Sequence, residues 1–528
     1  METVPWWKTA VIYQIYPRSF MDASGDGVGD LRGIRSKLDY LSWLGVDAIW
    51  ISPFYPSPMA DFGYDISNYE AVDPLFGTLE DFDALLADVH GRGIKLILDF
   101  VPNHTSDQHP WFLQSRADRT SPTRDWYIWR DGKSGGPPNN WLSMFGGSAW
   151  EYDPVTDQYY YHAFLKEQPD LNWANEAVVE AMLGAMRFWL ERGIDGFRVD
   201  VMWHLAKDPQ FRDEPANPAW RVGDDPYARL EHLYSCDQPG VHPIVRRMRE
   251  TLAAFGDKVL IGEIYLSLDH VITYYGSDGK SGAHLPFNFQ LLTTPWRASE
   301  LVALIEEYER LLPAGAWPNW VLGNHDRMRL ATRVGPDQAR VAAMLLLTLR
   351  GTPTLYYGDE LGLEDVPIPP HSVQDPWEKN VPGLGLGRDP VRTPMPWSAA
   401  PQGGFSTAAP WLPLNGDYAA RNVAALQDEK GGLLSLYRTL LGLRKVHPAL
   451  NRGEICDVRS LGDVLIYERR DGADRFTIAL NLSPVPTPAL AIHGWVVLST
   501  TMDTARATAI SSIALAPNEG VIIRHVAF

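Results

Sequence analysis

The stretch GIDGFRVDV, residues 193–201, decides the fold of this chain. It follows an amphipathic segment, residues 177–193, in which apolar side chains recur at helical spacing and a glycine ends the helix. The short apolar run at residues 196–200 is typical of a buried parallel strand. Arg198 and Asp200 stand two residues apart, so on a strand they point to one face, and the guanidinium favours an ionised carboxylate. A purely structural salt bridge would explain this pair alone equally well.

The pattern of strand, loop and helix repeats on both sides of this stretch. Strands that alternate with helices indicate a parallel sheet, and eight such units predict a (β/α)8 TIM barrel with its active site at the strand ends. The expected helices include residues 31–45, 79–93, 177–193 and 433–445. The expected strands lie within residues 11–20, 47–53, 95–104, 196–200, 258–265, 285–290, 320–326 and 352–360.

Two regions depart from this rhythm. Residues 105–171 are rich in Trp, Pro, Gly and Asn and predict a loop-rich domain inserted after the third strand. Residues 450–528 show short alternating strands with turns, which predict a separate antiparallel β domain at the C-terminus. The barrel itself would then comprise residues 1–104 and 172–449.

Composition narrows the class of partner. The net charge of −18 argues against nucleic acids and anionic membranes, whereas a neutral substrate would be indifferent to it. No apolar run is long enough for a transmembrane helix, and the N-terminus lacks the apolar stretch of a signal peptide. Two cysteines, Cys236 and Cys456, fit a reducing compartment, so we expect a cytoplasmic protein. The sequence gives no prediction of oligomeric state.

Three carboxylates stand at the ends of predicted barrel strands: Asp200, Glu263 and Asp326. Buried charges are rarely left unpaired without reason, and acids at this edge of a barrel are typical of catalysis. Glycoside hydrolysis needs one carboxylate to attack the anomeric carbon and a second to protonate the leaving oxygen. His104 and His325 also lie at strand ends, where imidazoles could bind sugar hydroxyls.

Five motifs in order carry a resemblance to a known family: DFVPNH (residues 99–104), QPDLN (168–172), GFRVD (196–200), GEIY (262–265) and GNHD (323–326). They resemble the signature regions of the α-amylase superfamily, glycoside hydrolase family 13. The QPDLN motif is similar to the extra region of its oligo-1,6-glucosidase branch. The resemblance covers essentially the whole chain and is strongest to bacterial exo-acting α-glucosidases.

The resemblance implies a role for each matching residue. Asp200 would be the nucleophile, Glu263 the general acid/base and Asp326 the group that stabilises the distorted glucose. Arg198 would orient Asp200, and His104 and His325 would bind hydroxyls of that glucose. Asp65, in FGYD (residues 62–65), would clamp the non-reducing 4-OH together with Arg392, in preference to the nearby Arg388, and Tyr64 would stack beneath the ring.

This clamp implies exo action on short oligosaccharides and disaccharides. The family chemistry is retaining, through a covalent β-glucosyl-enzyme, so transglycosylation should accompany hydrolysis, and no cofactor is required. Endo-acting α-amylases carry Lys and His three and four residues after the nucleophile; here Trp203 and His204 stand there, which disfavours starch. Val201, next to the nucleophile, resembles the α-1,6-acting enzymes of the branch and favours isomaltose-type and mixed linkages.

The loop DASGDGVGD, residues 22–30, predicts a structural metal site far from the chemistry. Its glycine-spaced oxygen ligands suit Ca²⁺ or Mg²⁺. The family loop usually has Asn or Asp where Ser24 stands, and a glycine-rich turn with solvated acids is the alternative. The candidate ligands are Asp22, Ser24, Asp26, the carbonyl of Val28, and Asp30.

Two alternatives stay open at this stage. A sucrose- or trehalose-processing glucosyltransferase or isomerase would share every catalytic residue, so only its products would separate it from a hydrolase. A non-catalytic, transporter-associated barrel belongs to a different class. Such relatives carry a membrane anchor and lose catalytic carboxylates, whereas this sequence keeps all three and shows no anchor.

Overall fold

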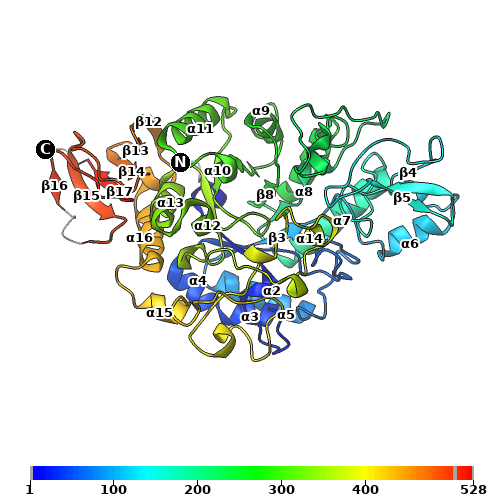
Figure 1. The fold of residues 1–528 in the computed structure, drawn as a ribbon, viewed down its shortest axis with the longest axis horizontal. Helices are drawn as coiled ribbons and strands as arrows, with labels where there is room; N and C mark the ends of the chain where they lie inside the picture. Colours follow the sequence, from blue (N-terminus) through cyan, green and yellow to red (C-terminus); the bar gives the residue numbers. More distant parts are fainter. Residues whose placement is uncertain (1–3, 504–507, 526–528) are drawn as a thin grey trace.

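The computed structural model describes residues 4–503 and 508–525. Its centre is an 8-stranded parallel sheet rolled into a barrel, with helices around it (Figure 1). The predicted (β/α)8 fold is therefore confirmed. In sheet order the strands are β10 (Asn319–Val321), β11 (Thr352–Tyr356), β1 (Ile12–Ile15), β2 (Ala48–Ile51), β3 (Lys95–Phe100), β7 (Gly196–Val199), β8 (Val259–Gly262) and β9 (Leu285–Pro286).

Amphipathic helices cover the outside of the barrel. In α7 (Glu176–Arg192), the Asn175 side chain caps the first turn, and Gly193 ends the helix in the left-handed conformation at φ 106°. The apolar face of α7 is buried, which directs the chain into β7. The other long helices are α5 (Leu79–Gly91), α8 (Val241–Ala253), α11 (Ala298–Leu311), α13 (Pro336–Thr348) and α16 (Leu433–Val446).

Side chains rather than a backbone ladder close the barrel between β9 and β10. The backbone N–H of Asn288 donates to Oδ1 of Asn319 at 2.9 Å, and Nδ2 of Asn319 donates to the carbonyl of Pro286. Inside the barrel, buried apolar side chains such as Ile12, Trp50 and Ile261 form a packed core. The strand ends are thus held in fixed positions around one central point.

Several predicted elements differ from expectation in their bounds. The first strand ends at Ile15 because Pro17 begins a short helix, α2 (Pro17–Phe20). The expected helix at residues 31–45 is two helices, α3 (Leu31–Ser36) and α4 (Leu38–Leu44). The sixth strand, expected over residues 285–290, contains only Leu285–Pro286.

Two further sheets lie at opposite ends of the molecule (Figure 1). A 3-stranded antiparallel sheet beside α6 (Pro110–Ala117) lies within the insertion, and a 6-stranded antiparallel sheet follows the barrel. None of the described helices is both long and apolar enough to span a membrane. The small sheet contains β4 (Trp129–Arg130), β6 (Gln158–Tyr161) and β5 (Trp150–Asp153); the larger contains β12 (Glu454–Leu461), β13 (Val464–Asp471), β14 (Asp474–Asn481), β17 (Gly520–Arg524), β15 (Gly494–Ser499) and β16 (Ala509–Ile510).

Candidate active site

One buried arginine joins the carboxylates of three neighbouring strands. Nη1 of Arg198, on β7, lies 2.8 Å from Oδ1 of Asp99 and 2.8 Å from Oδ1 of Asp200. Its Nη2 lies 2.7 Å from Oε2 of Glu263, which follows β8. Burial alone would lower the pKa of Arg198, but the surrounding carboxylates outweigh it and raise the pKa well above the usual value. Arg198 is therefore a permanent cation beneath the site.

Asp200 and Glu263 form a hydrogen-bonded pair of buried carboxyl groups. Burial and mutual repulsion raise the pKa of Asp200 well above its usual range, and burial raises the pKa of Glu263, although Arg198 opposes both shifts. Two such groups cannot both ionise at low cost, so the pair retains one proton and titrates as a unit. One ionised and one protonated carboxyl is the state that a nucleophile and a general acid require.

Asp326 behaves in the opposite way. Its Oδ1 lies 2.7 Å from Nη2 of Arg392 and 3.5 Å from Nη1 of Arg388, and its Oδ2 lies 3.4 Å from Nε2 of His325. Burial opposes ionisation, but the guanidinium charges of Arg392, Arg388 and Arg198 prevail, and the pKa of Asp326 is lowered. The ionised form of this carboxylate is thereby favoured, and it can stabilise positive charge on a substrate.

The three carboxylates line one pocket. Of the predicted binding residues, Tyr64, His104 and His325 also line it. Arg198 and Arg392 are absent from its lining and act on it through the carboxylates. The remaining lining residues are Asp61, Met144, Phe145, Phe164, Gln168, Val201, Trp203, Tyr265, Arg327, Trp377 and Arg388.

Both pocket histidines are neutral. Burial lowers the pKa of His104 to about 4 and that of His325 well below the usual value. Nδ1 of His325 lies 2.8 Å from the amide nitrogen of Gln14, and its Nε2 lies 2.6 Å from the Tyr64 hydroxyl. With the Gln14 amide oriented in this way, Nδ1 accepts and Nε2 carries the proton. The Tyr64 ring stacks on His325, with centroids 5.4 Å apart.

The structure contradicts the predicted clamp of Asp65 and Arg392. Asp65 is fully buried, and its oxygens accept from the Ser57 hydroxyl and from the backbone N–H groups of residues 60 and 61. It is therefore a structural residue of the turn. Asp61, four residues earlier, lies in the pocket with Arg388, the less favoured arginine, at 2.6 Å between Oδ1 and Nη2. Arg392 instead contacts Asp326 and the carbonyl of His325.

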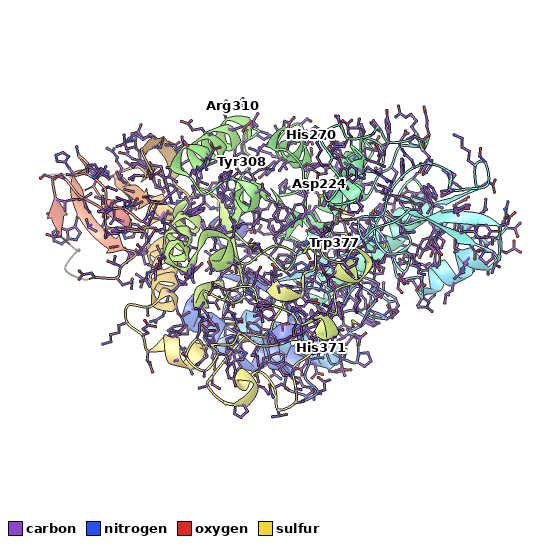
Figure 2. All side chains as sticks on the ribbon, viewed as in Figure 1. Asp224, His270, Tyr308, Arg310, His371 and Trp377 are labelled. Atoms are coloured by element: carbon purple, nitrogen blue, oxygen red, sulfur yellow. The ribbon has the colours of Figure 1, made fainter. Side chains whose placement is uncertain are left out.

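Several pocket residues escaped the sequence analysis. Gln168, in the QPDLN motif, places its amide nitrogen 3.3 Å from Oδ2 of Asp61 and 3.1 Å from Nε2 of His104. Phe145 and Trp377 come from distant segments and pack with ring centroids 5.4 Å apart. Trp377 lies on α14 (Pro376–Asn380), in the middle of the view in Figure 2. Gln168 could have been found through its motif, whereas the aromatic pair has no local signal.

The loop at residues 22–30 is a hydrogen-bonded turn in this structure. Oδ1 of Asp22 accepts from Ser24 and Gly25, and its Oδ2 accepts from Gly27 and Ser406. Oδ2 of Asp30 likewise accepts two backbone N–H groups. The carboxylates of Asp22 and Asp30 are thus hydrogen-bonded within the turn, and the described part of the chain holds no cluster of three His, Cys, Asp or Glu residues suited to a metal. Metal binding here stays a prediction.

Comparison with known proteins agrees with the barrel and its pocket. Residues 14–453 match the family model described as the α-amylase catalytic domain. A probable α-glucosidase of Rhizobium meliloti (strain 1021) is 44% identical over 90% of this chain and 89% of its own length. The crystal structure of the α-glucosyl transfer enzyme XgtA superimposes with a TM-score of 0.93 at 43% identity, covering 99% of this chain and 100% of that one.

The trehalulose synthase MutB of Pseudomonas mesoacidophila MX-45 superimposes with a TM-score of 0.90 at 35% identity, over 99% of this chain and 100% of that one. A barrel with paired carboxyls in a pocket at its strand ends is typical of carbohydrate-active enzymes, and the matches are specific within that class. The chain belongs to the α-amylase family, glycoside hydrolase family 13, in its α-glucosidase branch. It is a glycoside hydrolase.

Proposed function

We propose that this protein is a retaining exo-α-glucosidase that releases glucose from the non-reducing end of short α-glucosides. The observation that carries the proposal is the buried ion pair of Asp61 and Arg388 beside Asp326, in the same pocket as Asp200 and Glu263. A charged wall of this kind suits the hydroxyls of a terminal sugar and blocks a longer chain. That combination favours removal of one glucose at a time.

The chemistry follows from the positions of the two central carboxyls. The reaction requires the shared proton of the pair to lie on Glu263. Asp200, ionised beside Arg198, then attacks the anomeric carbon while Glu263 donates its proton to the leaving oxygen. Water, activated by Glu263, then releases glucose from Asp200. The two carboxyls share one guanidinium and a hydrogen bond, which leaves no space for the water of an inverting mechanism. Asp326 would stabilise the positive charge on the sugar ring.

Two further features of the proposal concern the acceptor side. Val201 lines the pocket next to the nucleophile, and we attribute to it a preference for α-1,6 and mixed linkages over starch. The likeness to an α-glucosyl transfer enzyme supports transglycosylation from the covalent intermediate. We also propose a cytoplasmic location, because two free cysteines fit a reducing compartment.

The test is to incubate the purified protein with maltose, isomaltose, trehalose, sucrose and starch and to separate the products over time. Release of α-glucose from isomaltose and maltose but not from starch is the expected result, with the α anomer observed by NMR before mutarotation. Release of β-glucose would contradict retention. Release of maltose or longer products from starch would contradict exo action.

A second function has one observation in its favour, the likeness to a trehalulose synthase. In that case the bound glucose would be returned to fructose rather than transferred to water. The same experiment separates the two functions. A rearranged disaccharide formed from sucrose without free glucose would identify an isomerase, whereas glucose and fructose in equal amounts would identify a hydrolase.

A further inference from the structure

The chain makes a bulge directly after the nucleophile. Strands β7 and β8 pair in parallel, with Val199 opposite Gly262, and the N–H of Glu263 donates to the carbonyl of Val199. An unbroken ladder would next bring the N–H of Val201 to the carbonyl of Glu263. Instead the N–H of Met202 occupies that carbonyl, at 3.1 Å. One extra residue is therefore inserted, and the N–H of Val201 is released from the ladder.

This released N–H points at the side chain of Glu263. The distance from the Val201 nitrogen to Oε2 is 2.9 Å, and Nη2 of Arg198 lies 2.7 Å from the same oxygen. Oε2 thus accepts the N–H of Val201 and lies against the guanidinium of Arg198, and neither group can accept a proton. The acidic proton of Glu263 is consequently confined to Oε1.

The bulge carries a conformational cost. Val201 has φ 36° and ψ 47°, in the left-handed region. Among the described non-glycine residues with positive φ, Val201 alone has a β-branched side chain, the kind that tolerates this conformation least. A strained backbone beside a reactive group persists only where its surroundings hold it. Here the holding contacts run from Val201 and Met202 to Glu263.

We propose that the peptide N–H of Val201 is a positioning group that selects which oxygen of Glu263 carries the proton. The inference rests on the proposed function, because it assumes that Glu263 is the general acid. Without the bulge, the N–H of Val201 would pair β7 with β8. With the bulge, it connects the segment that carries the nucleophile to the side chain of the general acid. It supplies a specific reason for the strained valine.

Other charged and titratable groups also act on Glu263, so a pH profile must be compared with matched variants. From β7 these are Arg198 and Asp200, and from β3 Asp99. From the loop after β10 they are Asp326 and Arg327, and from the segment after β8 Tyr265. None of them is altered by a change confined to one backbone atom.

The experiment replaces residue 201 by its α-hydroxy acid, which turns the peptide N–H into an ester oxygen and leaves every side chain in place. The matched control is the same replacement at residue 202, which removes the N–H bound to the carbonyl of Glu263. Activity is measured on isomaltose, whose leaving group needs protonation, and on α-glucosyl fluoride, which needs little acid catalysis. Thermal unfolding is followed for both proteins.

The 201 ester should lose about tenfold in kcat/KM on isomaltose but at most about twofold on the fluoride, because only the first reaction needs the acid. The basic limb of its pH profile should rise by about one unit, since a hydrogen bond that favours the ionised carboxylate is lost. The 202 ester should lose about as much thermal stability as the 201 ester. It should show neither the selective loss of kcat/KM on isomaltose nor the shift of the basic limb. Val201→Gly, which retains the N–H, should leave the basic limb in place.

Three results would overturn the positioning role. The first is a 201 ester in which neither the ratio of kcat/KM on isomaltose to that on the fluoride nor the basic limb of the pH profile changes. The others are a basic limb that moves by the same amount in the 202 ester or in Val201→Gly. If the 201 ester does not fold, Val201→Gly still decides, because a moved limb there would assign the role to the side chain. A wild-type protein that cleaves neither substrate would overturn the proposed function, and with it the role of Glu263.

Discussion

Buried arginines occur in two regions of this molecule, and their partners differ. At the top of the barrel Arg198, Arg388 and Arg392 face carboxylates, and the pKa of each is raised despite burial. At the junction with the C-terminal sheet, Arg444 and Arg469 are equally buried but donate only to backbone carbonyls. Burial there lowers their pKa values, to about 10 and about 9.

The comparison distinguishes arginines that set the protonation of catalytic carboxyls from arginines that satisfy buried backbone carbonyls. In the site, clustered opposite charges hold carboxyls in defined protonation states. At the junction, two guanidiniums satisfy the last carbonyls of α13 and α17 (Pro448–Asn451), which a helix cannot satisfy itself. Burial alone does not distinguish these roles; the chemistry of the partner does.

The largest expected effect is that of Asp200→Asn. Loss of the nucleophile should lower kcat on isomaltose by about 10⁴-fold or more, as for other groups that form a covalent intermediate. The melting temperature should be unchanged or higher, because repulsion with Glu263 is removed. Initial rates and thermal unfolding measure both. A variant that keeps more than about one hundredth of the activity would contradict the assignment.

Asp61→Asn and Asp65→Asn form a matched pair four residues apart. Asp61→Asn breaks the ion pair with Arg388 and should lower kcat/KM by about 10- to 100-fold, mainly through KM, with little loss of stability. Asp65→Asn keeps only one acceptor oxygen, so its amide NH2 faces one of the two backbone N–H groups and should cost about 1–3 kcal/mol of stability. Kinetics and urea unfolding of both variants test whether Asp61 and Arg388, rather than Asp65 and Arg392, bind the terminal sugar. A larger effect of Asp65→Asn on KM would contradict this assignment.

Arg469→Met tests the junction. The substitution leaves the buried carbonyls of residues 348 and 450 without this donor, so the free energy of unfolding should fall by about 2–4 kcal/mol. The kcat of the folded enzyme should not change. Arg388→Met is the comparison variant from the site; it should lower kcat/KM, and it should also cost stability because it leaves buried Asp61 without its cation. Equal kinetic losses in both variants would remove the distinction between the two regions.

A smaller effect concerns pH and His109, the N-cap of α6. Burial lowers the pKa of His109 to about 4, below the unfolded value, so the unfolded chain binds more protons between about pH 6.5 and 4. Stability that is present above pH 6.5 is therefore lost as pH falls through this window. His109→Asn keeps a capping side chain without the titration and should reduce the loss between pH 7 and 4.5 by about 1–2 kcal/mol. Denaturant unfolding at the two pH values measures it; an unchanged loss would contradict the prediction.

The smallest expected effect tests the loop at residues 22–30. With the oxygens of Asp22 already hydrogen-bonded, exchange of calcium or magnesium for EDTA should leave the melting temperature within about 1 °C. A metal-dependent rise of several degrees, lost in Asp22→Asn, would instead establish the metal site that the spacing predicts and would require the turn to rearrange.

The sequence by itself determined the barrel and the three carboxylates. Helical periodicity with a terminal glycine located α7, and the apolar run after it located β7 with Arg198 and Asp200 on one face. These features depend on local spacing, which the order of residues states directly. The ends of strands were less predictable: Pro17 shortened the first strand.

Only the tertiary structure decided the rest of the site. Asp61 and Asp65 lie four residues apart, as do Arg388 and Arg392, and residue type does not say which member of each pair faces the pocket. That depends on how the turn at residues 57–65 buries one carboxylate under its own N–H groups. The contact of Phe145 with Trp377 and the bulge at Val201 likewise arise between distant segments, whose packing no local pattern encodes.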